Sequence, residues 1–268
     1  MNKKIDGHRA RKRFGQNFLQ DANVINQIVR AINPKMENHV VEIGPGLGAL
    51  TDELIGNCFL SVIELDRDLV SKLETRYPQH ENFKIYQGDA LKFDFNQLVE
   101  ENPAEKIKLV GNLPYNISTP LIFHLLKFKH LITDMHFMLQ KEVVERITSA
   151  PGSKTYGRLS VILQYACETN HVFNVSPDAF IPPPKVDSAI VRIKPRETIE
   201  EPVADELFFQ QLVTKAFSQR RKTIRNTLKS LASETQLQAA EIDPGARPET
   251  ISVQSYIRLT NILDSTHT

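Results

Sequence analysis

The chain has 268 residues, of which 41% are hydrophobic and 24% are charged, and its formal net charge is +1. This balance is typical of a folded globular protein and excludes wholesale disorder, while the length suits one α/β domain with a small appendage. No apolar run approaches the roughly 18 residues of a membrane span, and the basic N-terminus lacks the apolar stretch of a secretory signal, so we expect a cytoplasmic protein.

Short apolar runs alternate with amphipathic stretches in the first two-thirds of the chain, which predicts βαβ units around a mostly parallel sheet of seven strands, with an antiparallel hairpin at its end. The expected strands are His39–Ile43, Leu60–Glu64, Phe83–Gln87, Ile107–Val110, Met135–Leu139, His171–Val175 and Ser188–Ile193. The expected helices between them are Asp21–Ile32, Asp68–Arg76, Pro120–Lys127, Lys141–Ser149 and Arg158–Ala166, with Asp21 as an N-cap.

The pattern changes after Pro195, where a polar linker leads into apolar residues at helical spacing. Helices are expected at Leu207–Phe217, Lys222–Ala232 and Ser252–Leu263, and no strand candidate remains. We therefore expect a Rossmann-like domain over residues 1–199 and a small all-helical domain over residues 200–268.

The charge is unevenly distributed. Residues 1–13 carry six Lys and Arg against one Asp, and residues 215–230 carry six more and no acid, so the rest of the chain is acidic. Two basic segments on an acidic body indicate polyanion binding, with two ordinary solvated faces as the alternative.

Cysteine and histidine usage predicts no metal site. Cys58 and Cys167 are far apart in sequence, and the histidines show no metal-binding spacing, so we expect two small buried thiols and no zinc motif or disulfide framework.

A glycine-rich segment, EIGPGLGAL at Glu42–Leu50, follows the first expected strand. Gly44, Gly46 and Gly48 allow a sharp turn and close approach to a ligand, but their G-x-G-x-G spacing differs from the dinucleotide fingerprint. Glu64 ends the next strand, where its carboxylate can accept hydrogen bonds from ribose hydroxyls. The combination indicates an adenosyl ligand without phosphates, with a packing turn as the alternative.

Two further motifs stand at strand ends, where ligands bind in open α/β sheets. In QGDAL (Gln87–Leu91), Asp89 can accept a hydrogen bond from an adenine amine or can simply cap a helix. In NLPY (Asn112–Tyr115), the Asn112 side chain and the Leu113 carbonyl can accept the two hydrogens of an exocyclic amine, and Tyr115 can stack on an unstacked base. Two such acceptors favour the nucleophilic geometry of the amine nitrogen. NLPY is therefore interpreted as a site that activates an exocyclic adenine amine, and a plain turn is the alternative.

These motifs resemble one family. NLPY is similar to the [DN]-P-P-[YF] signature of amino-methyltransferases, and by itself it would equally suit antibiotic-resistance methyltransferases that act on large-subunit rRNA. The wider set of motifs resembles small-subunit (16S) rRNA adenine N6,N6-dimethyltransferases. The segments that carry the resemblance are RKRFGQNFL (Arg11–Leu19), VEIGPGLGALT, QGDAL, VGNLPYNISTPL, YGRLSV (Tyr156–Val161), FIPPPKVDSAIV and FSQRRKTIRNTL (Phe217–Leu228).

The resemblance implies a class I methyltransferase fold, S-adenosylmethionine as cofactor, and dimethylation of two adjacent adenines near the 3′ end of small-subunit rRNA. It assigns cofactor contacts to Gln16, Asn17, Leu19, Gly44, Gly46, Gly48, Glu64, Leu65, Asp89, Ala90 and Asn112. It also implies that Tyr115 and Phe180 sandwich the target base, although Phe180 can instead be a core aromatic.

The second basic segment is expected to hold RNA phosphates through Arg220, Arg221, Lys222 and Arg225. Lys222, Arg225 and Lys229 would share one face of the expected helix. The implied partner is the immature small ribosomal subunit, approached by a monomer with a role in ribosome biogenesis.

Three other functions fit parts of the sequence. A DNA adenine methyltransferase shares NLPY but usually has a larger recognition region, and a non-enzymatic assembly factor would not need Glu64, Asn112 and Tyr115. A nicotinamide dehydrogenase is disfavoured by the glycine spacing.

Overall fold

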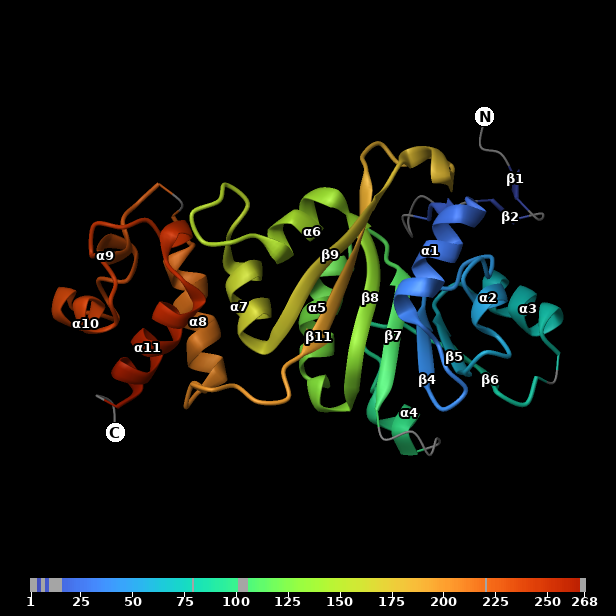
Figure 1. The fold of residues 1–268 in the computed structure, drawn as a ribbon, viewed down its shortest axis with the longest axis horizontal. Coiled ribbons are helices and arrows are strands. Elements are labelled where there is room, and N and C mark those ends of the chain that lie inside the picture. Colours follow the sequence, from blue (N-terminus) through green and yellow to red (C-terminus); the bar gives the residue numbers. More distant parts are fainter. Residues whose placement is uncertain are drawn as a thin grey trace. The chain divides into compact units, whose positions relative to one another are not determined.

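The computed structural model describes residues 4–5, 8–9, 16–78, 80–100, 106–219 and 221–265. The chain forms two compact units, one of Met1–Val144 with Asn170–Pro195 and one of Glu145–Thr169 with Arg196–Thr268 (Figure 1). The second unit thus includes a helical segment that lies before residue 199. The functional division into a catalytic and an RNA-binding part at that residue remains a prediction.

A seven-stranded sheet has the order β6-β5-β4-β7-β8-β11-β9. The strands are β4 (His39–Ile43), β5 (Phe59–Glu64), β6 (Phe83–Gln87), β7 (Ile107–Asn112), β8 (Ile132–Gln140), β9 (Cys167–Val175) and β11 (Ser188–Pro195). The pairs from β6 to β8 are parallel, and β11 runs antiparallel to β8. The expected mostly parallel sheet of seven strands is confirmed.

Helix α1 (Ala22–Ile32) shows how local sequence sets an element. The Asp21 carboxylate accepts hydrogen bonds from the backbone N–H groups of Asn23 (2.8 Å) and Val24 (3.1 Å), so the predicted N-cap is confirmed. At the other end, the Lys108 ammonium of β7 donates to the Ile32 carbonyl at 3.0 Å. A cation at the helix C-terminus is favourable, and here it also ties α1 to the sheet.

The remaining α-helices in the described residues up to 166 are short or medium in length. They are α2 (Thr51–Leu54), α3 (Arg67–Arg76), α4 (Asn96–Glu100), α5 (Ser118–Leu126), α6 (Lys141–Thr148) and α7 (Arg158–Ala166). Helices α3, α5, α6 and α7 match the sequence expectation, whereas α2 and α4 are too short to leave a helical pattern. Two-residue strands also pair outside the main sheet, β1 (Lys4–Ile5) with β2 (His8–Arg9), and β3 (Phe18–Leu19) with β10 (Phe180–Ile181).

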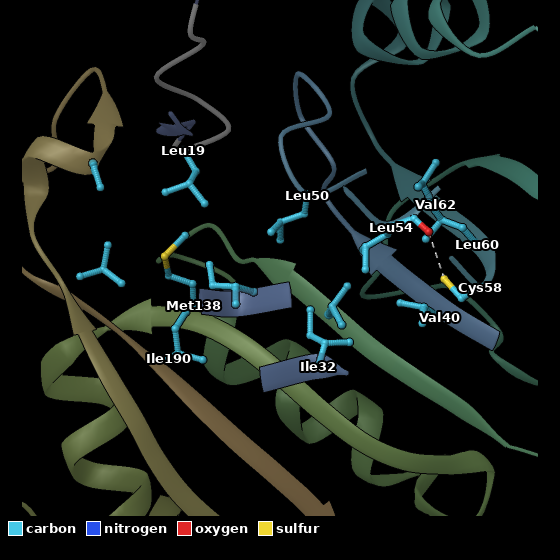
Figure 2. Close-up of a cluster of buried hydrophobic side chains, with 14 of the residues drawn as sticks. Leu19, Ile32, Val40, Leu50, Leu54, Cys58, Leu60, Val62, Met138 and Ile190 are labelled. Carbon is cyan, nitrogen blue, oxygen red and sulfur yellow. Dashed lines mark hydrogen bonds between the residues drawn. The ribbon is translucent and has the colours of Figure 1, made fainter. Parts of the chain in front are cut away.

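One hydrophobic cluster of the first unit lies on one face of the sheet. Apolar residues at alternate strand positions, including Val40, Val62 and Met138, pack with Ile32 of α1 and Leu54 of α2 (Figure 2). Burying such side chains stabilises the fold by about 1.5–3 kcal/mol each. Cys58 belongs to this core and donates to the Leu54 carbonyl at 3.5 Å, and both cysteines are buried free thiols, as expected.

The second unit is helical beyond Pro195, with α8 (Glu206–Ala216), α9 (Ile224–Thr227), α10 (Glu234–Ala239) and α11 (Val253–Asp264). Aromatic rings contribute to its packing, for example Tyr165 with Phe209 at 4.8 Å between centroids. No helix in the described part of the chain is long and apolar enough to cross a membrane.

One predicted helix is wrong. Residues 222–232 were expected to form a continuous helix, but only Ile224–Thr227 is helical. The backbone N–H groups of Ile224 and Arg225 donate to the carbonyls of Ala246 and Pro244, so contacts distant in sequence hold a single turn. Ile224 and Leu228 are apolar because both side chains are buried in the second unit. Their spacing is compatible with a longer helix but does not produce one.

Candidate active site

A cavity of about 370 Å³ opens at the carboxyl ends of strands β4, β5, β6 and β7. Ligands of open α/β sheets bind at this edge. The cavity wall brings together most of the residues singled out from the sequence, namely Gln16, Asn17, Leu19, Gly44, Gly46, Glu64, Leu65, Asp89, Ala90, Asn112, Leu113 and Tyr115.

The glycine-rich loop forms the floor of this cavity. Gly46 has φ +61°, a conformation that side chains rarely adopt, and a Cβ there would also lie 3.2 Å from the Phe18 ring. Gly48 has a different role, because a Cβ at that position would lie 3.0 Å from the Tyr77 hydroxyl, and the residue does not line the cavity. Gly48 allows α3 to pack against the loop.

Glu64 joins the loop to the next element. Its Oε1 accepts from the Asp66 N–H at 2.8 Å and its Oε2 from the Gly46 N–H at 3.3 Å. Burial raises the pKa of this carboxyl, while the backbone N–H groups oppose that shift by stabilising the carboxylate. Glu64 therefore holds the loop and also offers an acceptor to the cavity.

Asn112 is oriented by the N-terminal segment. Its Nδ2 donates to the backbone carbonyl of Asn17 at 2.9 Å. That carbonyl can only accept a hydrogen bond, so the side-chain nitrogen of Asn112 must face it. The Oδ1 atom of the same side chain is then the hydrogen-bond acceptor that Asn112 offers. The neighbouring Leu113 is buried, and its N–H donates to the Met138 carbonyl at 3.2 Å.

Tyr115 and Asp89 are also constrained by local contacts. The Tyr115 hydroxyl shares a hydrogen bond of 2.8 Å with the Ser188 hydroxyl, and burial raises the pKa of the half-buried phenol. The Asp89 carboxylate accepts from the Leu91 N–H at 3.0 Å. Asp89 thus supports its own turn and lines the cavity at the same time.

The sequence interpretation missed Glu42, which lies in the cavity wall and is the first residue of the glycine-rich segment. It is 2% exposed, and its Oε2 accepts from the Thr51 hydroxyl at 2.6 Å. Burial raises the pKa of this carboxyl to about 7, although the Thr51 hydrogen bond lowers it. An acid inside the apolar run HVVEI was the signal that could have identified it.

Phe180 is not part of the cavity wall. It is 2% exposed, belongs to the hydrophobic core, and pairs opposite Leu19 in the β10–β3 ladder. The structure therefore places it in the strand next to β3, which carries part of the N-terminal wall of the cavity. A contact with the target base stays a prediction.

The basic segment is arranged differently from the expected helix face. Lys222 lines a surface hollow of about 400 Å³ together with Lys215 and Lys229, whereas Arg221 and Arg225 do not. Arg225 instead lies 3.4 Å from the Glu234 carboxylate, and Arg220 lies outside the described residues. The expectation that Lys222, Arg225 and Lys229 share one helix face is wrong, because α9 ends at Thr227.

Within the described ranges, no group of three or more His, Cys, Asp or Glu side chains could hold a metal ion. The polar groups that line the cavity are carboxylates, amides, the Tyr115 hydroxyl and backbone groups.

Comparison with known proteins gives consistent matches along the chain. A model of the ribosomal RNA adenine dimethylase family matches residues 7–265. The Ribosomal RNA small subunit methyltransferase A of Pseudomonas putida is 56% identical over 257 residues, which cover 96% of this chain and 96% of that protein. A protein of the same name from Saccharophagus degradans is 55% identical over 260 residues, covering 97% and 96% of the two chains.

Solved structures show the same similarity at lower identity. A dimethyladenosine transferase from Plasmodium falciparum has a TM-score of 0.74 and 28% identity, covering 90% of this chain and 95% of that one. The 23S rRNA methyltransferase ErmE has a TM-score of 0.73 and 26% identity, covering 92% and 100%.

Proposed function

This chain belongs to the ribosomal RNA adenine dimethylase family, and from that premise we propose that it dimethylates the N6 amines of two adjacent adenines near the 3′ end of small-subunit rRNA. The chain is an rRNA methyltransferase with a class I methyltransferase fold. The observation that carries the proposal is that NLPY lines the same cavity as two acids suited to an adenosine ligand.

The donor set of the cavity fits S-adenosylmethionine. Glu64 offers carboxylate oxygens for ribose hydroxyls, Asp89 offers an acceptor for an adenine amine, and the apolar side chain of Leu65, 49% exposed, offers surface for a base. Gln16 and Asn17 supply polar groups at the N-terminal wall. When bound, this cofactor supplies an electrophilic methyl group, so the protein needs no metal and no covalent intermediate.

The residues of NLPY act on the amine. An exocyclic adenine amine is a poor nucleophile because its lone pair is delocalised into the ring. The Asn112 Oδ1, oriented by the bond from Nδ2 to Asn17, and the Leu113 carbonyl accept the amine hydrogens and favour a nucleophilic nitrogen. Tyr115 stacks on the extruded base, and the positioning of donor and acceptor accounts for most of the rate enhancement.

Removal of the proton from the methylated amine requires no general base. The attacking nitrogen becomes cationic on methyl transfer, and it can release its proton to water afterwards. Phe180 is proposed as a second contact of the target base, which requires that it reach the base from its buried position in β10, beside β3.

RNA binding is assigned to the basic hollow of the second unit. This hollow, which a backbone phosphate can enter, is surrounded by Lys215, Lys222 and Lys229. A further positive charge comes from Arg221, which precedes Lys222 in the sequence. Such contacts position the substrate and do not read its sequence. We therefore assign catalysis to residues 1–199 and RNA binding to residues 200–268, acting as a monomer on an immature small subunit in the cytoplasm.

The test is transfer of radiolabelled methyl groups from S-adenosylmethionine to immature small ribosomal subunits, with nucleoside analysis of the product. We expect N6,N6-dimethyladenosine from the wild type and its loss in Asn112→Ala and Tyr115→Ala. The matched control is Asn57→Ala, because Asn57 is exposed and its side chain donates to the Glu53 carbonyl at 3.0 Å, away from the cavity wall.

Other outcomes separate the alternatives. Label in large-subunit RNA or DNA but not in small subunits would keep the chemistry and overturn the substrate. No transfer to any nucleic acid would leave the assembly-factor interpretation. Calorimetric measurement of binding to S-adenosylmethionine and to NADH distinguishes a methyltransferase from a nicotinamide dehydrogenase.

A further inference from the structure

Tyr115 is held at two separate points. Its hydroxyl is 2.8 Å from the Ser188 Oγ, and its backbone carbonyl accepts from the Ser118 hydroxyl at 3.2 Å. The turn that presents it is closed by a further bond, from the Ile117 N–H to the Pro114 carbonyl at 3.1 Å. A tyrosine ring fixed at its tip and at its backbone loses the freedom to turn about its side-chain bonds.

Ser188 is a rigid anchor for the tip of that ring. It is the first residue of β11, pairs opposite Gln140 of β8, and has 0% exposure. The preceding residue is tied to the same strand end, because the Asp187 carbonyl accepts from the Lys141 N–H at 2.9 Å. The position of the Ser188 hydroxyl is therefore set by the sheet and not by a loop.

This contact links two motifs that are distant in sequence. Tyr115 is the last residue of NLPY, and Ser188 is the last residue of PPPKVDS (Pro182–Ser188). The proposed methyl-transfer chemistry uses no other residue of that second segment. A site built on rigid elements holds its reacting groups more accurately than one built on loops. A small misplacement of the stacking ring would reduce the rate without changing cofactor binding, because methyl transfer depends on close alignment.

We propose that Ser188 is a positioning residue for methyl transfer, which sets the orientation of the Tyr115 ring against the target adenine. This rests on the proposed function of Tyr115. A buried serine also needs a hydrogen-bond partner for stability alone, so the test must separate positioning from folding.

A double-mutant cycle makes that separation. The variants are Ser188→Ala, Tyr115→Phe and the two combined, and kcat for methyl transfer to immature small subunits is measured with both substrates saturating. A neutral hydrogen bond is worth enough to change a rate about 3- to 10-fold, so we expect each single variant to lose about that much. Because both remove the same bond, the combined variant should lose no more than either one. The Kd for S-adenosylmethionine should not change.

The matched control is Ser61→Ala. Ser61 is also a strand serine with 0% exposure, and its hydroxyl is 2.8 Å from the His39 Nε2. It lies outside the cavity wall, so we expect a loss of thermal stability with unchanged kcat.

Three results would overturn the inference: wild-type kcat in Ser188→Ala, wild-type kcat in Tyr115→Phe, or losses that multiply in the combined variant. Tyr115→Phe changes only a half-buried hydroxyl, so wild-type kcat in this variant overturns the inference even if Ser188→Ala does not fold. An inactive wild type would instead remove the proposed function itself.

Discussion

The buried acid Glu42 makes stability depend on pH in a direction that can be measured. Its carboxyl lies in β4 with 2% exposure, and burial raises its pKa from an ordinary value of 4.5 to about 7. The Thr51 hydroxyl partly opposes this shift by donating to Oε2, while the negative charges of Glu64 and Asp52 add to it. The folded state therefore prefers the protonated acid.

The sign and size of the effect follow from linkage. A folded-state pKa above the unfolded value gives stability that is fully present below about pH 4.5 and is lost as the pH rises through about 7. At about 1.4 kcal/mol per pH unit, the difference between the two values amounts to about 3 kcal/mol. Glu42→Gln replaces the acid with a neutral amide of the same shape, whose oxygen can still accept from Thr51.

We expect Glu42→Gln to match the wild type at about pH 4.5 and to exceed its free energy of unfolding by up to about 3 kcal/mol at about pH 8.5. Urea unfolding followed by circular dichroism at both pH values measures this difference. Glu53→Gln is the control, because it replaces an exposed carboxylate of helix α2 and leaves the buried acid unchanged. A difference from wild type that is the same at both pH values would refute the reasoning.

Three other predictions follow from contacts in the two units. A Cβ on Gly111 would lie 2.4 Å from a backbone carbonyl of β4, so Gly111→Ala should lower the free energy of unfolding by about 3 kcal/mol. Gly88→Ala is the control, because the space around Gly88 is open and the free energy of unfolding should not fall. Equal urea midpoints for the two variants would contradict this prediction. Arg76 donates to the backbone carbonyl of Leu47, a residue of the cavity wall, at 3.1 Å. Arg76→Ala should therefore weaken S-adenosylmethionine binding about 3- to 10-fold, as measured by calorimetry. An unchanged Kd would show that Arg76 does not hold the loop for cofactor binding. Lys222→Gln should reduce the slope of log K for RNA against log salt by about 1, whereas an unchanged slope would remove Lys222 from the phosphate contacts.

Local patterns were sufficient for the sheet and for most of the cavity. Parallel β-strands buried on both faces leave continuous apolar runs, and polar residues that follow such runs meet at one edge of the sheet. That is why Glu64, Asp89 and Asn112 could be assigned to one site although they are distant in sequence. Asp21 could be identified as an N-cap because capping involves only the next three residues.

Helix length in the second unit could not be predicted in this way. The apolar spacing of residues 222–232 is compatible with a helix, but the carbonyls of Pro244 and Ala246 bind its first N–H groups and α9 stops after one turn. Which lysines surround the basic hollow depends on that turn. Around the hollow, Lys222 and Lys229 are joined by Lys215 in place of the expected Arg225.

The sequence by itself determined the fold class and the chemistry of the cavity, because residue types at strand ends are set by spacing along one element. Only the tertiary structure decided which side chains those elements bring into contact. It placed Phe180 in the core, set Gly48 against Tyr77, and joined Tyr115 to Ser188. It also raised the pKa of Glu42, since desolvation depends on everything packed around a carboxyl and not on its neighbours in the chain.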